Sequence, residues 1–224
     1  MPTPLLFWDV DTQVDFMLPG GKLYVPGSEE IIPALRALTD YAHHTGTRIL
    51  ASADDHDPSD PELSDHPDFV ETFPPHCMHG TPGQEKIPET ALHEPLTIPP
   101  ERGNPGILRQ LVQSHLGDLL ILKRRFDVFS NPNMDAVLRG LDPKAIVLYG
   151  VALDVCDRFA IEGLLERRPQ TTIYFVTDAA RAIRPELVPG LLESWAARGV
   201  RMVTTADVVS GALDRDLRPV ARDS

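Results

Sequence analysis

The chain has 224 residues, with 33 acidic and 21 basic side chains and a formal net charge of −12 at pH 7. This charge disfavours nucleic acid as a partner, because a phosphate backbone requires a basic surface. The longest apolar run, 145–153, is too short to cross a bilayer, and the first residues lack the basic start and the length of a secretory signal. We therefore expect a cytoplasmic protein without membrane contact. No shift of composition divides residues 1–224, which predicts a single domain.

Apolar runs typical of strands alternate with segments typical of helices. The predicted strands cover residues 5–10, 48–53, 119–122, 145–149 and 172–176, with a sixth candidate at 200–203. The predicted helices cover residues 29–44, 105–115, 132–141, 154–168 and 185–199. Ser28 is the expected N-cap of the first helix, and Gly46 lies past its end. This succession predicts an α/β fold with three layers, α/β/α, and a doubly wound, mainly parallel sheet of about six strands.

Proline is frequent between the second and third predicted strands, in residues 57–106. Proline prevents a helix from continuing and restricts the residue before it. Loops of this length are uncommon in compact domains and usually serve as lids or binding segments. We therefore expect a long, structured loop that contributes to a functional site.

Three reactive side chains follow predicted strands. Asp11 follows the first strand, Lys123 the third, and Cys156 lies shortly after the fourth. The carboxyl ends of parallel strands share one edge of a sheet, so the acid, the cation and the thiol are expected to meet there. Asp11 could then accept the thiol proton, and Lys123 could support a thiolate or an oxyanion. Taken singly, each has a structural alternative: a turn aspartate, a surface lysine and a packing cysteine.

The residues beside Cys156 affect its expected reactivity. Asp154 is the expected N-cap of the following helix, whose dipole would favour the thiolate. Asp157 would oppose the thiolate unless it points away or caps the helix. Arg124 and Arg125, next to Lys123, could bind an anionic substrate or lie in solvent.

A second group of polar side chains predicts a metal site. Asp54 and His56 are two residues apart at the end of a strand, so both point to the same side of an extended chain. His76 follows two prolines and offers a third ligand. Three protein ligands leave room for water or substrate, which is typical of a catalytic site for zinc, manganese or iron. His66 is an alternative further ligand, although we expect both His66 and His79 to be exposed.

In this order, the motifs resemble those of the nicotinamidase branch of the isochorismatase-like cysteine hydrolases. The matching segments are residues 11–16, 54–56, 74–77 with 80–83, Lys123, and 150–152 with Asp154 and Cys156. The resemblance implies that Asp11, Lys123 and Cys156 hydrolyse a carbon–nitrogen bond, that Asp54, His56 and His76 hold the metal, and that residues 151 and 152 are joined by a cis peptide bond. It also implies an oxyanion hole of the Ala152 and Cys156 backbone amides, and a substrate ring held between Phe16 and Phe73.

The leading hypothesis is a metal-binding cysteine amidohydrolase that converts nicotinamide, or a related small carboxamide, to the acid and ammonia through a thioester. One alternative is a related amidohydrolase acting on carbamoyl or ureido groups. Another is a catalytically silent scaffold with the same fold. A small-molecule amide is the expected partner, and the sequence leaves the formation of a homo-oligomer open.

Overall fold

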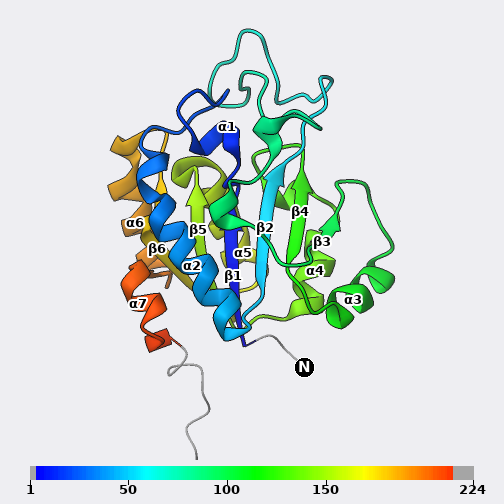
Figure 1. Ribbon diagram of the computed structural model, residues 1–224, viewed down its shortest axis with the longest axis vertical. Coiled ribbons are helices and arrows are strands. Elements are labelled where there is room, and N and C mark those ends of the chain that lie inside the picture. The colour runs from blue at the N-terminus through cyan, green and yellow to red at the C-terminus, as the bar shows by residue number, and fades with distance from the viewer. Residues whose placement is uncertain (1–3, 214–224) are drawn as a thin grey trace, which may run out of the picture.

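The computed structural model describes residues 4–213, in which a seven-stranded parallel sheet lies between two layers of helices (Figure 1). The strands are β1 Leu5–Val10, β2 Ile49–Asp54, β3 Leu96–Ile98, β4 Leu119–Lys123, β5 Ala145–Val151, β6 Thr172–Arg181 and β7 Arg201–Val203. The helices are α1 Val14–Met17, α2 Ile32–Thr45, α3 Pro105–Ser114, α4 Met134–Leu141, α5 Arg158–Arg167, α6 Val188–Ala197 and α7 Thr205–Val209.

The central strands are buried on both faces, which explains why they are apolar without alternation. One face packs against α2 and α7 through side chains such as Leu38 and Val208. The other face packs against α3, α4, α5 and α6 through side chains such as Val137, Ile161 and Trp195. The predicted three-layer, doubly wound α/β fold is therefore confirmed.

The strand order is β3-β4-β2-β1-β5-β6-β7. From β1 the chain builds the sheet first through β2, β3 and β4 on one side and then through β5, β6 and β7 on the other. The order therefore reverses between β1 and β5, and in such sheets the carboxyl edge at the reversal is where ligands bind. Gly150 allows the close approach there: its φ is +137°, and a Cβ atom at this position would lie 2.1 Å from the Val10 carbonyl oxygen.

The structure differs from the sequence predictions in several short elements. The three-residue edge strand β3 lies inside the proline-rich loop, so the sheet has seven strands rather than six. The short helices α1 and α7 were not predicted either, because four or five residues do not establish a helical period. Ser28 is not the N-cap of α2: it starts a 3-10 turn, Ser28–Ile31, and its hydroxyl donates to the Phe16 and Met17 carbonyls. Gly46 does end α2, with φ +67°.

The proline-rich loop begins at the carboxyl edge of the sheet, above the strand ends in Figure 1. Gln13 joins this loop to two strands. Its amide nitrogen donates to the carbonyl oxygens of Asp54 and Gln84, and its amide oxygen accepts from the Asp54 nitrogen. These bonds place the end of β2 and the loop at fixed positions beside Asp11. Among residues 4–213, no helix is both long and apolar enough to cross a membrane.

Candidate functional site

Asp11, Lys123 and Cys156 meet at the carboxyl edge of the sheet. The Lys123 ammonium nitrogen lies 2.9 Å from Oδ2 of Asp11 and 3.9 Å from the Cys156 sulfur, and all three side chains are buried. Lys123 also pairs with Asp54, its neighbour in the β2–β4 register. The carboxyl ends of β1, β2, β4 and β5 thus bring together Asp11, Asp54, Lys123 and Cys156, respectively.

The backbone at Asp11 turns its carboxylate toward Lys123. Its φ of +50° lies in the left-handed region, which aspartate adopts more readily than most residues. A hydrogen bond from the Asp11 backbone nitrogen to the Ser52 carbonyl oxygen stabilises this backbone conformation. The Ser52 hydroxyl donates to Oδ1 of Asp11 at 2.7 Å, which leaves Oδ2 for the ammonium.

Cys156 lies in a π-helical turn, Leu153–Asp157, that precedes α5. The prediction that Asp154 caps this helix is wrong. Its carboxylate instead accepts from the backbone nitrogens of Ile183 and Arg184, after β6. Asp154 therefore ties the nucleophile's turn to the neighbouring strand. The peptide bond between Val151 and Ala152 is cis, as the resemblance implied.

The charges at this site place a proton on the sulfur at rest. Burial raises the pKa of the Cys156 thiol well above its usual value; Lys123 opposes this rise, and Asp11 and Asp54 add to it. Burial also raises the pKa of Asp11, against the charge of Lys123. Burial alone would lower the pKa of Lys123, but Asp11 and Asp54 raise it well above the ordinary value. The expected helix-dipole thiolate is thus outweighed by burial, and a base is needed to take the proton.

Asp54, His56 and His76 lie together, and a fourth residue, Glu62, joins them. Their ligand atoms are all within 4.8 Å of one another, and all four residues are buried. Oδ2 of Asp54 is 3.5 Å from Nε2 of His76 and 3.8 Å from Nε2 of His56, which is 3.7 Å from Oε1 of Glu62.

Sequence reasoning missed Glu62, because nothing in its spacing separates it from the other acids of residues 57–71, which are Asp57, Asp60, Asp65, Asp68 and Glu71. His66 is exposed, and the exposed His79 pairs with Asp55, so neither joins the cluster.

This donor set fits a divalent metal ion. Nε2 of His56 is buried and has no hydrogen-bond partner, while its Nδ1 contacts Asp60. Nδ1 of His76 lies 2.7 Å from the Pro74 carbonyl, so its Nε2 is also left for the cluster. A histidine that binds a metal through one ring nitrogen typically donates a hydrogen bond from the other, which fixes the orientation of the ring. Burial, and after it the charge of Asp54, raises the pKa of Glu62 to about 7.

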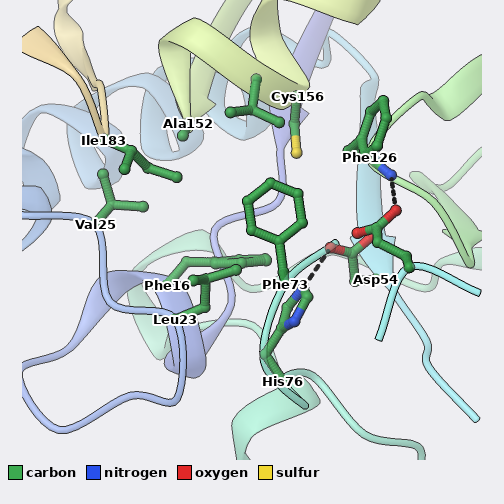
Figure 2. Close-up of a pocket in the computed structure, with 12 residues that line it drawn as sticks. Phe16, Leu23, Val25, Asp54, Phe73, His76, Phe126, Ala152, Cys156 and Ile183 are labelled. Carbon is green, nitrogen blue, oxygen red and sulfur yellow. Dashed lines mark hydrogen bonds and ion pairs between the residues drawn. The ribbon is translucent and has the colours of Figure 1, made fainter. Parts of the chain in front are cut away.

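A small cavity opens beside the thiol. Figure 2 shows Cys156 and Ala152 at one end, Phe73 in the middle, and Asp54 and His76 nearby. Phe16 and Phe73 both line it, and the centres of their rings lie 5.3 Å and 6.3 Å from the centre of the His76 ring. The remaining lining residues were not predicted; they are Leu23, Val25, Glu62, Phe126, Val155 and Ile183. The cavity is thus apolar apart from the thiol and the candidate metal ligands.

Asp157 is buried directly after the nucleophile. Neither oxygen of its carboxyl group has a hydrogen-bond partner within residues 4–213, and its side chain is fully inaccessible. Burial, with the nearby charges of Asp11 and Asp154, raises its pKa well above the usual value. The folded state therefore keeps a proton that the unfolded chain releases near pH 4.

We expect Asp157→Asn to stabilise the protein at neutral pH. Because the folded pKa is raised, the contribution of Asp157 to stability is full below about pH 4 and is lost as pH rises above it. At pH 7 the variant should gain about 1–3 kcal/mol in the free energy of unfolding, because the wild type must take up a proton on folding, at about 1.4 kcal/mol per pH unit above the unfolded pKa, and asparagine does not. Urea unfolding at pH 4.5 and 7 measures this, with Asp65→Asn in the exposed loop as a control. If Asp157→Asn were no more stable than the wild type at pH 7, the Asp157 carboxylate would have to be well solvated in the folded protein.

Comparisons with known proteins identify relatives of this chain. The family model described as the Isochorismatase domain matches residues 5–207. The nicotinamidase/pyrazinamidase of Mycobacterium tuberculosis is 40% identical over 86 residues, which cover 35% of this chain and only 41% of that protein. A probable inactive nicotinamidase of Arabidopsis thaliana is 23% identical over 181 residues, 80% of this chain and 81% of the relative. The pyrazinamidase of Pyrococcus horikoshii, solved in complex with zinc, superposes with a TM-score of 0.70 and 25% identity, covering 89% of this chain and 98% of that one.

Proposed function

We propose that this chain, which belongs to the isochorismatase family of hydrolases, is a metal-binding cysteine amidohydrolase of small carboxamides. The observation that carries the proposal is the buried contact of Lys123 with both Asp11 and Cys156, at 2.9 Å and 3.9 Å, at one end of an apolar cavity. A packing cysteine would need neither a buried ammonium nor a buried carboxylate, since both are costly to bury.

In the first half of the reaction, Asp11 accepts the thiol proton, and the Cys156 sulfur attacks the amide carbonyl carbon. Lys123 keeps the negative charges of carboxylate and sulfur together. The backbone amides of Ala152 and Cys156 stabilise the oxyanion, and one such donor typically contributes about 2.7–4 kcal/mol. Asp11 returns the proton to the nitrogen, ammonia leaves, and a thioester remains on Cys156.

In the second half, Asp11 accepts a proton from water as the water oxygen attacks the thioester. The carbon–sulfur bond then breaks, the carboxylic acid leaves, and the sulfur regains its proton. The same carboxylate thus serves both steps, consistent with its burial beside the thiol.

The cavity favours a small, flat amide. Its walls are mainly apolar, and the rings of Phe16 and Phe73 can contact a flat substrate ring. Nicotinamide is the first candidate. Asp54, His56, Glu62 and His76 would hold a divalent ion, zinc, manganese or iron, which would polarise bound water or a substrate nitrogen.

The proposal is tested by measuring ammonia release from nicotinamide, pyrazinamide and a ureido compound, with metal analysis of the same sample. Hydrolysis of the ureido compound alone would favour the carbamoyl alternative. Release from none of them, with an inert thiol, would favour the silent scaffold. One observation favours that second candidate: the carboxyl group of Asp157 is buried beside Cys156. Rapid labelling of Cys156 by a small electrophile would argue against it.

We expect the double substitution His56→Ala with His76→Ala to remove the metal. Two of four ligand side chains are then lost, while Lys123 and Asp11 keep their ion pair. Bound metal, measured by mass spectrometry after dialysis, should fall at least about tenfold. The control is His66→Ala, which removes an exposed histidine of the same loop. Full metal content in a folded double variant would show that the ligands are assigned wrongly.

A further inference from the structure

Two arginines near the cavity lack an anionic partner. Within residues 4–213, the arginines whose side chains make neither an ion pair nor a hydrogen bond are Arg102, Arg109, Arg125, Arg139, Arg158 and Arg198. All of these are exposed except Arg125 and Arg158, which are half-buried. Burying part of a cation without a counter-charge is unfavourable. These two positions therefore require an explanation that the other four do not.

Both guanidinium groups flank an aromatic pair at the cavity wall. Phe126 lines the cavity, on the side opposite Val25 and Ile183 in Figure 2, and its ring lies 4.8 Å from the ring of Phe159. The Arg125 guanidinium carbon is 5.7 Å from the centre of the Phe126 ring. The Arg158 guanidinium carbon, two residues after the nucleophile, is 5.0 Å from the centre of the Phe159 ring.

The neighbouring acids do not neutralise these cations. Glu62 accepts from the Phe126 nitrogen and otherwise faces His56 in the metal cluster. Asp127 accepts from the Phe129 nitrogen as a cap. Nε of Arg158 is buried and has no acceptor at all. Neither arginine itself lines the cavity, but each stacks on the Phe126–Phe159 pair, and Phe126 forms part of the cavity wall. A planar guanidinium with unused donors is suited to bind a carboxylate.

We propose that Arg125 and Arg158 bind a carboxylate group of the substrate, so that the preferred substrates are small carboxamides that also carry a carboxylate. This inference rests on the proposed amidohydrolase function and narrows its substrate class. The carboxamide lies at Cys156, and the substrate carboxylate lies at the Phe126 wall. The pair also supplies local positive charge at the site of a protein whose net charge is −12, which would otherwise repel anions.

The test compares half-amides of two- to five-carbon dicarboxylic acids with the matching diamides, which differ only in the charged group. The wild type should favour the half-amide by at least about tenfold in kcat/KM at the chain length that fits, since only the half-amide can form charge-assisted hydrogen bonds with the guanidinium groups. Arg125→Gln and Arg158→Gln should each remove most of this preference, because each should lower kcat/KM for the half-amide more than for the diamide. Arg124→Gln is the matched control, because Arg124 is adjacent, exposed and paired with Glu101.

The outcomes separate the two proposals. If amides are hydrolysed but the preference is absent, or survives both glutamine variants, the carboxylate site is wrong and the amidohydrolase stands. If no amide is hydrolysed, the amidohydrolase fails, and carboxylate binding is then read from thermal stabilisation by oxalate, malonate, succinate and glutarate at low salt. Stabilisation that both glutamine variants lose and Arg124→Gln keeps would support the site. Equal melting temperatures with and without these dianions would overturn it.

Discussion

Cys156→Ala is expected to lower kcat for ammonia release from a carboxamide by roughly 10³- to 10⁶-fold, the range seen when a hydrolase loses its nucleophile. The variant keeps the metal ligands, the cavity and the ion pair of Lys123 with Asp11, so binding of metal should persist. Ammonia release at saturating substrate measures the loss, and metal content measured in the same sample shows that the site is intact.

The chain supplies its own control for this variant. Cys77 is the other of the two cysteines; it is buried in the hydrophobic cluster that also contains Phe16 and Met17, and it does not line the cavity. Cys77→Ala should retain activity once any loss of stability is accounted for by circular dichroism. Wild-type activity in folded Cys156→Ala would disprove thiol catalysis. Inactivity of a folded Cys77→Ala would assign the chemistry to the wrong cysteine.

Of the variants discussed, Lys123→Met should lose the most stability. Its ammonium lies between the carboxylates of Asp11 and Asp54, and all three side chains are buried. Removing one member of a buried ion pair typically costs about 3–5 kcal/mol, because the remaining charge is left uncompensated. For a protein of this size the melting temperature should fall by roughly 6–20 °C. Activity should be lost as well.

The pH dependence of unfolding identifies why Lys123→Met loses stability. Without Lys123, the two carboxyl groups keep their protons in the folded state, so the stability of the variant should fall as pH rises above about 4, relative to the wild type. Adding Asp54→Asn to Lys123→Met should restore part of the stability. Lys144→Met, at an exposed pair with Asp142, should cost at most about 1 kcal/mol. Equal losses in urea unfolding for both lysine variants would show that Lys123 is not held as a charged group.

The fold class and the reactive residues could be predicted from the sequence because both depend on local pattern. Unbroken apolar runs separated by helical segments predict a parallel sheet, and the polar residue after each run must lie at its carboxyl edge. Asp11, Lys123 and Cys156 follow such runs, and Asp54 and His56 end another. Their proximity then follows from the topology of the sheet.

Other features depend on contacts between distant segments. Glu62 faces the metal cluster, and Asp154 binds residues 183 and 184, because the loop and the end of β6 fold over the strand ends. The short strand β3 forms only because β4 offers it an edge. Burial likewise decides the protonation of Cys156 and Asp157, and burial is a property of the packed molecule. The sequence by itself determined which reactive groups reach the sheet edge, through strand periodicity and order. Only the tertiary structure decided which loop residues join them and which protons they hold, since desolvation and long-range contacts set both.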